Sequence, residues 1–365
     1  KIGNANIRKA PSDWMELFHA LFSVETPPTF GWGAFVMLRK GTAQTRALLH
    51  ILTRGDILAI VRTDVPMTSA LCEETILKLV DTYPFLRTEV LTTTAFGRPV
   101  RTLTIGEGDR KVIYSAAHHA NEWITTPLIL KFIEELAEAV QNQGRLYGVE
   151  ARNIVRAATI YTVPMVDPDG VDLVTGAIKT GTLQYAAAQQ LSDNYPQIPF
   201  PEGWKANLLG VDLNLQYPAG WLRAREIKFS QGYTRPGPRD YVGRAPLNQR
   251  ESIALADFTQ EIDPALVLAY HTQGKVIYWQ FQDYAVPGAR ELGEEFARLS
   301  GYELADTPYE SSFAGYKDWF IQKFRRPGYT IEAGSGQNPL HIEQFPEIYR
   351  DNLGILVTAA LGLPH

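Results

Sequence analysis

An apolar run followed by a cluster of histidine, asparagine and glutamate side chains places the strongest constraint on how this chain can fold. The run covers residues 112–116 and is typical of a buried strand. Thr126-Pro127, shortly after it, is typical of a helix start with Thr as N-cap and Pro in the first turn. The polar cluster therefore occupies a loop that joins a strand to a helix. In open α/β sheets, ligands bind at such loops, at the carboxyl ends of strands.

His119 and Glu122 in this loop have the residue types and the spacing of metal ligands. When they lie three residues apart at a turn, an imidazole nitrogen and a carboxylate can point at one position, and both are ordinary ligands of zinc. Catalytic zinc usually has three protein ligands and one open position, so a third ligand must come from elsewhere in the chain. A chance occurrence of His-x-x-Glu is the alternative interpretation of the motif on its own.

The composition excludes several classes of protein. The chain has 365 residues, of which 45% are hydrophobic, enough for one large core or for a large domain with a small one. Its 35 basic and 40 acidic residues nearly balance and form no basic tract, so nucleic acid is not an expected partner. No apolar run is long enough to span a membrane, and Cys72, the only cysteine, excludes an intramolecular disulfide. The chain begins with Lys1 rather than Met, which suggests a fragment or a processed form.

The order of the predicted elements indicates an α/β fold. Residues 1–60 follow no consistent pattern and are expected to form an N-terminal arm of uncertain fold, whereas residues 61–365 are expected to form the catalytic domain. Apolar runs predict strands at 88–94, 100–105, 112–117, 157–165, 266–270, 276–280 and 328–331, and amphipathic patterns predict helices at 69–83, 126–142, 291–299 and 346–361. Residues 166–170 are expected to form a turn. We therefore expect a mixed central β-sheet with helices on both faces.

Two further predicted strands also end in ionisable side chains. His271 follows the strand at 266–270, and Glu332 follows the strand at 328–331. Of the seven histidines, His119 and His271 are best placed for a zinc site, because His118 is offset by one residue and points to the opposite face. A carboxylate such as Glu332 can act as the general base for a zinc-activated water. A buried core histidine and a surface glutamate are the alternative interpretations on local grounds.

The motifs occur in an order that resembles zinc carboxypeptidases of the carboxypeptidase A type. The resemblance extends over roughly residues 65–365 and rests on five ordered elements: His119-Ala-Asn-Glu122-Trp, Asp167-Pro-Asp-Gly, Gly210-Val-Asp-Leu-Asn214, His271 and Tyr329-Thr-Ile-Glu332. It implies an α/β/α fold and a zinc metallopeptidase. It also implies that His119, Glu122 and His271 bind one zinc ion (Zn²⁺) per chain and that Glu332 activates water.

Three further roles follow from the same resemblance. Asp212 corresponds to the carboxylate that orients the first histidine of the zinc site. Lys205 stands where the family usually has an arginine, whose cation stabilises the tetrahedral oxyanion, and Lys supplies the charge without a bidentate fork. Tyr309 resembles the mobile tyrosine that lies over the substrate, although its spacing to Asp318-Trp319 is one residue longer here.

Two departures from the family pattern concern the substrate. Asn214-Leu215 stands where a carboxypeptidase has Asn-Arg, and Leu cannot bind the terminal carboxylate that this Arg binds. Lys317 occupies a position that lines the pocket for the side chain after the cut, and a partly buried cation there requires a carboxylate partner. Together they indicate a substrate whose acid lies at the end of a side chain. Meso-diaminopimelate of bacterial peptidoglycan fits this description, with Lys317 and Asn214 as its expected contacts.

A closer resemblance is to the γ-D-glutamyl-L-diamino acid endopeptidases of spore-forming bacteria, a branch of the same family. It is carried by residues 117–127, 212–218 and 312–319. It implies hydrolysis of the γ-D-glutamyl–diaminopimelate bond in peptidoglycan-derived peptides, in the bacterial cytoplasm or in association with the spore or cell wall. A metallocarboxypeptidase that removes ordinary C-terminal residues and a non-catalytic peptidoglycan-binding module are the alternative functions.

Overall fold

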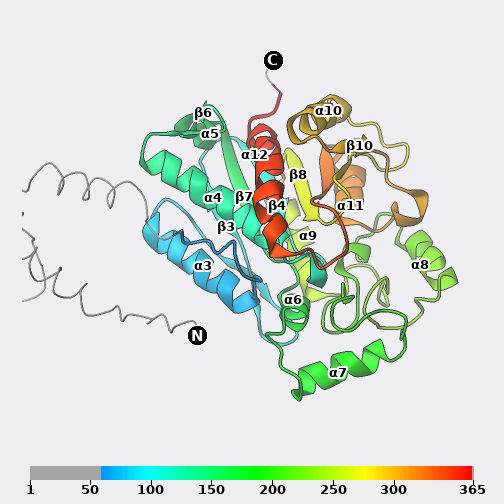
Figure 1. Cartoon of the computed structure of the whole chain (residues 1–365). Coiled ribbons are helices and arrows are strands. Elements are labelled where there is room, and N and C mark those ends of the chain that lie inside the picture. Colours follow the sequence, from blue (N-terminus) through cyan, green and yellow to red (C-terminus); the bar gives the residue numbers. More distant parts are fainter. Residues whose placement is uncertain (1–58, 364–365) are drawn as a thin grey trace, which may run out of the picture. The chain divides into compact units, whose positions relative to one another are not determined.

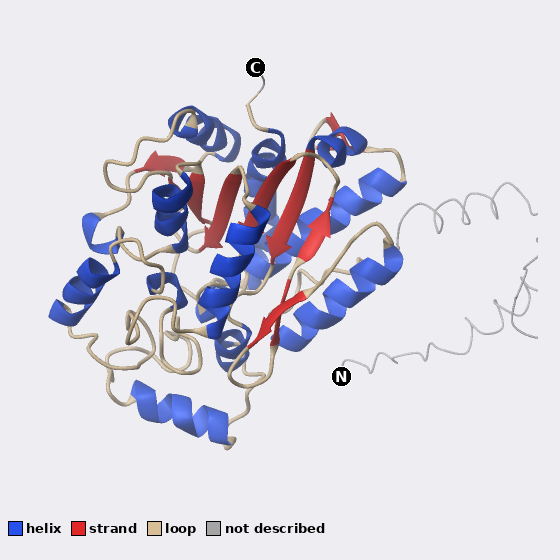
Figure 2. Ribbon diagram, turned by 180° about the vertical axis from the view of Figure 1, so that it is seen from behind, coloured by secondary structure: helices blue, strands red, loops and turns tan. Residues whose placement is uncertain are grey.

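The computed structural model describes residues 59–363, and a seven-stranded mixed sheet lies at the centre of this part (Figure 1). Helices cover both faces of the sheet, which confirms the predicted fold class (Figure 2). In spatial order the strands are β10 (Glu303–Ala305), β9 (Val276–Tyr278), β11 (Gly328–Glu332), β8 (Leu266–His271), β4 (Arg110–Ser115), β7 (Ala158–Val163) and β3 (Leu103–Ile105).

The four central strands, β11, β8, β4 and β7, run parallel to one another. Strand β3 is antiparallel to β7, β9 is antiparallel to β11, and β10 is parallel to β9. In this register Glu332 lies opposite His271 and Ser115 lies opposite Ala269. Because the carboxyl ends of parallel strands share one edge of a sheet, the loops after β4, β8 and β11 meet there.

Alternate side chains of the sheet enter two different hydrophobic cores. Val112 and Tyr114 of β4 belong to one core, whereas Ile113 between them belongs to the other, as the two-residue period of a strand requires. The first core is covered by helices α3 (Ser69–Thr82), α4 (Thr125–Gln141), α5 (Ala151–Ala157), α10 (Ala289–Ser300) and α12 (Phe345–Leu361). The second is covered by α8 (Trp221–Ser230), α9 (Arg250–Ile262) and α11 (Tyr316–Phe324).

Smaller elements complete the described part of the chain. Two hairpins lie outside the main sheet, β1 (Val90–Thr93) with β2 (Pro99–Arg101) and β5 (Arg145–Leu146) with β6 (Val149–Glu150). Helices α6 (Pro168–Val174) and α7 (Leu183–Ser192) follow β7, and single turns of 3₁₀-helix occur at η1 (Ala120–Glu122), η2 (Leu213–Leu215), η3 (Tyr309–Ser311) and η4 (Ile342–Gln344). Among the described helices, none has the length and apolarity needed to cross a membrane.

Three local predictions are wrong, each because a tertiary contact or a cap was misjudged. Helix α4 begins at Thr125, and the hydroxyl of Thr126 donates to the carbonyl of Pro164 instead of capping the helix. The expected turn at 166–170 is instead the start of α6, where the Asp167 side chain accepts a hydrogen bond from the backbone N–H of Gly170. The single strand expected at 100–105 is split at Thr102 into β2 and β3, which join different sheets.

The prediction of a separate N-terminal arm concerns residues 1–60, of which 1–58 lie outside the described residues. The first described residues are held by helix α4. The backbone N–H groups of Ile60 and Val61 both donate to the carboxylate of Glu134, at 2.6 and 3.3 Å. The boundary at residue 60 therefore stays a prediction. Ile60 and Val61 are already attached to the α/β domain through Glu134.

Candidate active site

His119, Glu122 and His271 come together at the carboxyl edge of the sheet. His119 follows β4, Glu122 ends the turn η1, and His271 is the last residue of β8. The Nδ1 atoms of both histidines lie 2.9 Å from a carboxylate oxygen of Glu122, and they lie 3.2 Å from each other. Among the described residues, these three form the one group of three side chains that could hold a metal ion.

Local hydrogen bonds fix the loop that carries His119 and Glu122. The hydroxyl of Thr125 accepts from the backbone N–H of Ala117 and donates to the carbonyl of Glu122. The backbone N–H of Thr272 donates to the second oxygen of Glu122, which ties this carboxylate to the end of β8. These hydrogen bonds within the protein therefore direct the side chains of His119 and Glu122 toward the end of β8.

The geometry of the group fits a zinc ion. Ligand atoms 2.0–2.1 Å from a tetrahedral zinc lie about 3.3 Å from one another, close to the separations found here. The second nitrogen of His119, Nε2, lies 3.2 Å from Oδ1 of Asp212. That contact orients the ring and leaves Nδ1 as the coordinating atom. The donor set of two imidazoles and one carboxylate is the common one for catalytic zinc.

The charges in the group depend strongly on one another. Burial disfavours the charged form of His119, but the carboxylates of Glu122 and Asp212 outweigh it and raise its pKa to about 9. Burial also acts against ionised Glu122, yet His119 and Lys205 hold its pKa well below the ordinary range. Burial lowers the pKa of His271. The site therefore keeps the Glu122 carboxylate ionised and the His271 imidazole neutral, which are metal-binding forms, whereas His119 has to release a proton when a metal binds.

Glu332 stands next to this group at the end of β11. It is the register partner of His271, and both line the same pocket. Burial and the nearby carboxylate of Glu122 raise the pKa of Glu332 to about 8. A carboxyl group with such a raised pKa can both accept and return a proton near neutral pH.

Lys205 and His118 complete the immediate surroundings. The ammonium of Lys205 donates to Glu122 at 2.9 Å and lines the pocket. His118 is fully buried, its Nε2 lies 2.9 Å from the hydroxyl of Ser115, and its ring stacks on His271 with centroids 5.2 Å apart. Lys205 is thus placed to act in the pocket, whereas His118 packs behind the metal-binding group.

The pocket beside the metal-binding group contains most of the residues predicted to bind substrate. Asn214, Leu215 and Lys317 all line it. The side-chain oxygen of Asn214 accepts from the backbone N–H of Tyr316. Leu215 stands where the family pattern has an arginine, so the pocket wall is apolar at that point.

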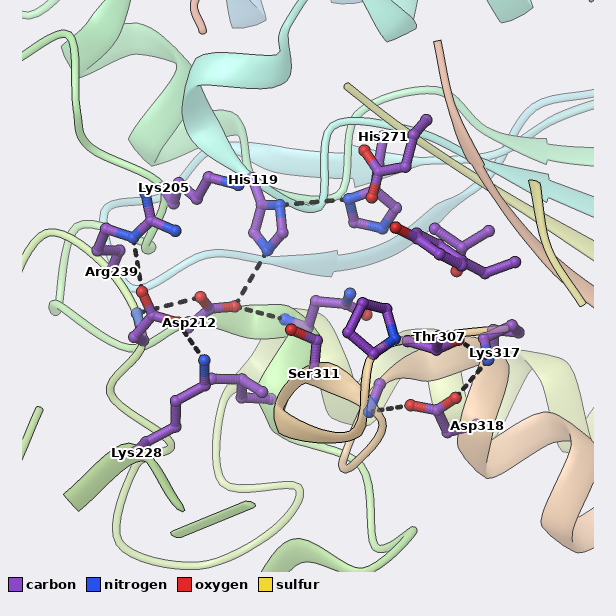
Figure 3. Close-up of a pocket in the computed structure, with 18 residues that line it drawn as sticks. His119, Lys205, Asp212, Lys228, Arg239, His271, Thr307, Ser311, Lys317 and Asp318 are labelled. Atoms are coloured by element: carbon purple, nitrogen blue, oxygen red, sulfur yellow. Dashed lines mark hydrogen bonds and ion pairs between the residues drawn. The ribbon is translucent and has the colours of Figure 1, made fainter. Parts of the chain in front are cut away.

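Lys317 lies at the end of the pocket away from Lys205 (Figure 3). Its side chain is 4% exposed, and its ammonium lies 2.6 Å from the carboxylate of Asp318. It also donates to the carbonyl of Gln280 at 2.6 Å and to the hydroxyl of Thr307 at 3.3 Å. The carboxylate partner that the sequence required is therefore the next residue in the chain, and the donors of this lysine already have protein partners.

Tyr309 is the one predicted site residue that belongs neither to the metal-binding group nor to the lining of the pocket. It is 57% exposed, its hydroxyl accepts from Nε of Arg223 at 3.1 Å, and its ring packs edge-on against Phe313. Its neighbours Pro308 and Ser311 do line the pocket. A role over the substrate would require this side chain to leave Arg223.

Sequence reasoning missed a second group of charged residues in the pocket. Arg239, Asp240 and Lys228 line the pocket, and Figure 3 shows Arg239 and Lys228 on the same side as Asp212. Asp240 forms ion pairs with Lys228 at 2.7 Å and with Arg239 at 2.6 Å. These residues belong to α8 and the loop after it, where the sequence carries no short motif. An arginine next to an aspartate in a proline- and glycine-rich segment was the one available signal.

Comparison with known proteins identifies the family. The model of the peptidase M14 family, described as zinc carboxypeptidase, matches residues 72–354. The chain belongs to the zinc carboxypeptidase family. It is therefore a zinc metallopeptidase, and its His-Glu-His group is a site that fits the metal of the family.

Two curated bacterial proteins and one solved structure give the range of similarity. The chain is 44% identical over 286 residues to γ-D-glutamyl-L-diamino acid endopeptidase 1 of Lysinibacillus sphaericus, covering 77% of this chain and 68% of that protein. It is 37% identical over 286 residues to the uncharacterized protein YqgT of Bacillus subtilis strain 168, covering 78% and 74%. Bovine thrombin-activatable fibrinolysis inhibitor in complex with tick carboxypeptidase inhibitor has the same fold, with a TM-score of 0.62 at 16% identity, covering 82% of this chain and 97% of that chain.

Proposed function

We propose that this zinc peptidase hydrolyses the γ-D-glutamyl–diaminopimelate bond of peptidoglycan stem peptides. The 44% identity to a γ-D-glutamyl-L-diamino acid endopeptidase supports the substrate class. The observation that carries the proposal is the lining of the pocket. It has Leu215 where a carboxypeptidase has its carboxylate-binding arginine, and a buried cation, Lys317, at its far end.

The metal-binding roles proposed from the sequence agree with the geometry. His119, Glu122 and His271 would hold the zinc ion, and Asp212 would orient His119 through Nε2. When bound, zinc supplies Lewis-acid chemistry, since it polarises the scissile carbonyl and makes water more acidic. The distances of 2.9–3.2 Å between the ligand atoms support this assignment.

The remaining steps fall to side chains of the pocket. Glu332 removes the proton of the attacking water and delivers it to the leaving amine, as its position beside His271 allows. Lys205 stabilises the negative charge that develops on the carbonyl oxygen. Asn214 and Lys317 contact the diaminopimelate part of the substrate. To bind a carboxylate, Lys317 would replace its weakest partner, the Thr307 hydroxyl at 3.3 Å.

We further propose a domain organisation and a place of action for the protein. We assign residues 61–365 to the catalytic domain and residues 1–60 to an arm, since the compact unit begins at Ala59. A substrate derived from peptidoglycan implies action on released peptides in the cytoplasm or on the spore or cell wall. Tyr309 retains a role over the bound substrate only if it swings away from Arg223.

The test compares substrates that separate this function from ordinary carboxypeptidase activity. The wild type should cleave L-Ala-γ-D-Glu-meso-diaminopimelate about 10-fold or more faster than the lysine analogue, because a buried charged hydrogen bond is worth about 1.5–3 kcal/mol. Lys317→Gln should reduce this ratio to near one, whereas Lys323→Gln on the exposed face of α11 should preserve it. An unchanged ratio in Lys317→Gln would contradict the role of this pocket.

A second comparison addresses the two alternative functions. A carboxypeptidase should trim a benzoyl dipeptide with a free C-terminus and lose this activity when the terminus is amidated. Preference for such dipeptides over the diaminopimelate peptide would favour the carboxypeptidase. Binding of the peptide without any hydrolysis by the zinc-loaded protein would favour the non-catalytic peptidoglycan-binding module.

A further inference from the structure

Three lysines and one arginine line the pocket, and the ammonium group of each lysine pairs with a carboxylate. Lys205 pairs with Glu122, and Lys317 pairs with Asp318. Lys228 is 11% exposed and pairs with Oδ1 of Asp240 at 2.7 Å. Arg239 is the fourth cation, and its contacts are different.

The side chain of Arg239 is 39% exposed, and within residues 59–363 it makes hydrogen bonds and ion pairs through a single nitrogen. Its Nε donates to Oδ2 of Asp240 at 2.6 Å. The two terminal nitrogens of the guanidinium make no hydrogen bond or ion pair with the described residues, while the side chain lines the pocket. These two nitrogens form the edge that binds a carboxylate in a bidentate pair.

Backbone contacts place Arg239 next to the reacting groups. The backbone N–H groups of Lys205 and Ala206 both donate to the carbonyl of Pro238, at 2.7 and 2.9 Å. On the other side of Arg239, the backbone N–H of Asp240 donates to Oδ2 of Asp212, whose Oδ1 lies against His119. Figure 3 shows Arg239 on the same side as Lys205 and Asp212, and Lys317 at the opposite side.

Asp240 holds the guanidinium of Arg239 in one orientation, but its single negative charge does not cancel the two positive charges of Lys228 and Arg239. It is 8% exposed, and its two carboxylate oxygens are shared between Lys228 and Arg239. Two cations thus share one anion. An anionic group entering the pocket would meet a guanidinium that is already held in place and has unused donors. Binding would therefore cost little conformational entropy of the Arg239 side chain.

We propose that Arg239 binds a carboxylate of the substrate beside the scissile bond and so supplies the cation that Leu215 cannot supply. The inference rests on the proposed function, since it takes the peptidoglycan peptide as the substrate. It adds a specificity residue from the loop after α8, a segment outside the motifs that resemble the family.

Two carboxylates of the substrate have the required chemistry. One is the α-carboxylate of D-glutamate, on the acyl side of the bond, and the other is the α-carboxylate of diaminopimelate at its L-centre, on the leaving side. Amidation of either group removes the negative charge and leaves the scissile bond intact. The two sources are therefore separated by two singly amidated peptides.

The experiment measures kcat/KM of the wild type and Arg239→Gln on the unmodified tripeptide and on both amides. We expect Arg239→Gln to lose about 10- to 100-fold on the unmodified peptide, the value of a charge-assisted bidentate pair. On one of the amides the two proteins should be equal. That amide identifies the carboxylate, and Arg239→Lys should recover part of the loss.

Arg235→Gln is the matched control, because Arg235 lies in the same loop, contacts Asn194 and does not line the pocket. It should match the wild type on all three peptides. Equal losses of Arg239→Gln on the unmodified peptide and on both amides, with an unchanged melting temperature, would overturn the inference. The Lys228–Asp240 pair remains in this variant, so the loop is expected to stay folded.

A binding measurement separates failure of this inference from failure of the proposed function. If the wild type cleaves none of the three peptides, the proposed function is wrong. Calorimetric titration of the unmodified tripeptide into the zinc-loaded wild type and Arg239→Gln then decides the role of Arg239. A Kd about 10-fold or more weaker in the variant supports carboxylate binding, and equal Kd values or no binding by either protein contradict it.

Discussion

The strand-end group and the loop wall of the pocket are built in different ways. The strand-end group consists of His119, Glu122, His271 and Glu332, at or just after the ends of β4, β8 and β11. The loop wall consists of the pocket-lining residues within 212–240 and 307–318, all of which lie outside the sheet. Hydrogen-bonded neighbours in the sheet fix the first, whereas ion pairs such as Lys228–Asp240 and Lys317–Asp318 fix the second.

This difference separates the chemistry of the reaction from the choice of substrate. The strand-end group has the spacing that zinc and a general base require, and a sheet edge can hold such spacing in proteins with different substrates. The loop wall carries the charges that face the substrate, and loops vary with little effect on the sheet. Changes in the strand-end group should therefore abolish turnover, while changes in the loop wall should alter selectivity.

The largest effect is expected at Glu332. Glu332→Gln keeps the shape of the side chain but cannot accept a proton, so kcat should fall about 10²- to 10⁴-fold. Zinc content and melting temperature should remain those of the wild type. Glu303→Gln, an exposed change on β10, serves as the control. If Glu332→Gln kept more than one tenth of the wild-type activity, another residue would have to be the general base. The strand-end group would then not be the part of the pocket that carries the chemistry.

A smaller effect is expected at the contact between the two regions. Asp212 belongs to the loop wall but touches His119. Asp212→Asn preserves an acceptor and weakens the charge that holds the ring, so zinc affinity should fall about 10- to 100-fold. Competition with a fluorescent zinc chelator measures this, with Asp193→Asn on the surface as the control. Unchanged zinc affinity would mean that the strand-end group needs no support from the loop wall.

Substitution of Glu251, a buried residue that belongs to neither region, should leave activity nearly unchanged and alter stability only. Burial raises the pKa of Glu251, near the start of α9, to about 7, and the carboxylate of Asp169 adds to this effect. Because the folded-state pKa is raised, the stability that the protonated group contributes is present below about pH 4.5 and is lost as pH rises to about 7. The loss amounts to roughly 3 kcal/mol.

Glu251→Gln resembles the protonated form and should remove this part of the pH dependence. In urea unfolding it should match the wild type near pH 4.5 and be more stable at pH 8. Parallel stability curves for the two proteins would show that Glu251 titrates normally in the folded state. Equal kcat/KM values at pH 7 would confirm that this position belongs to neither region of the pocket.

The sequence predicted the strand-end group because each member follows an apolar run. Val112–Ala116, Leu266–Tyr270 and Gly328–Ile331 are recognisable as buried strands, and parallel strands bring their carboxyl ends together. The metal-binding residues and Glu332 could therefore be placed from the order of motifs alone. Asp212 and Lys205 follow no apolar run and were predicted from the resemblance to the family alone, and both lie near the group in space.

The loop wall could not be predicted to the same depth. Whether Tyr309 faces the pocket depends on its contacts with Arg223 and Phe313, which no local pattern reveals. Arg239 reaches the pocket because the Pro238 carbonyl pairs with the backbone after Trp204, a contact between segments more than 30 residues apart. Helices α8, α9 and α11 were likewise not assigned, since their positions depend on packing against the second core.

The most direct test of this account is mass spectrometry of L-Ala-γ-D-Glu-meso-diaminopimelate incubated with the zinc-loaded protein, with a chelator present, and with Glu332→Gln. The account predicts release of free meso-diaminopimelate by the zinc-loaded wild type, and no release after chelation or in the variant. Absence of that product, together with trimming of ordinary C-terminal residues from other peptides, would contradict it.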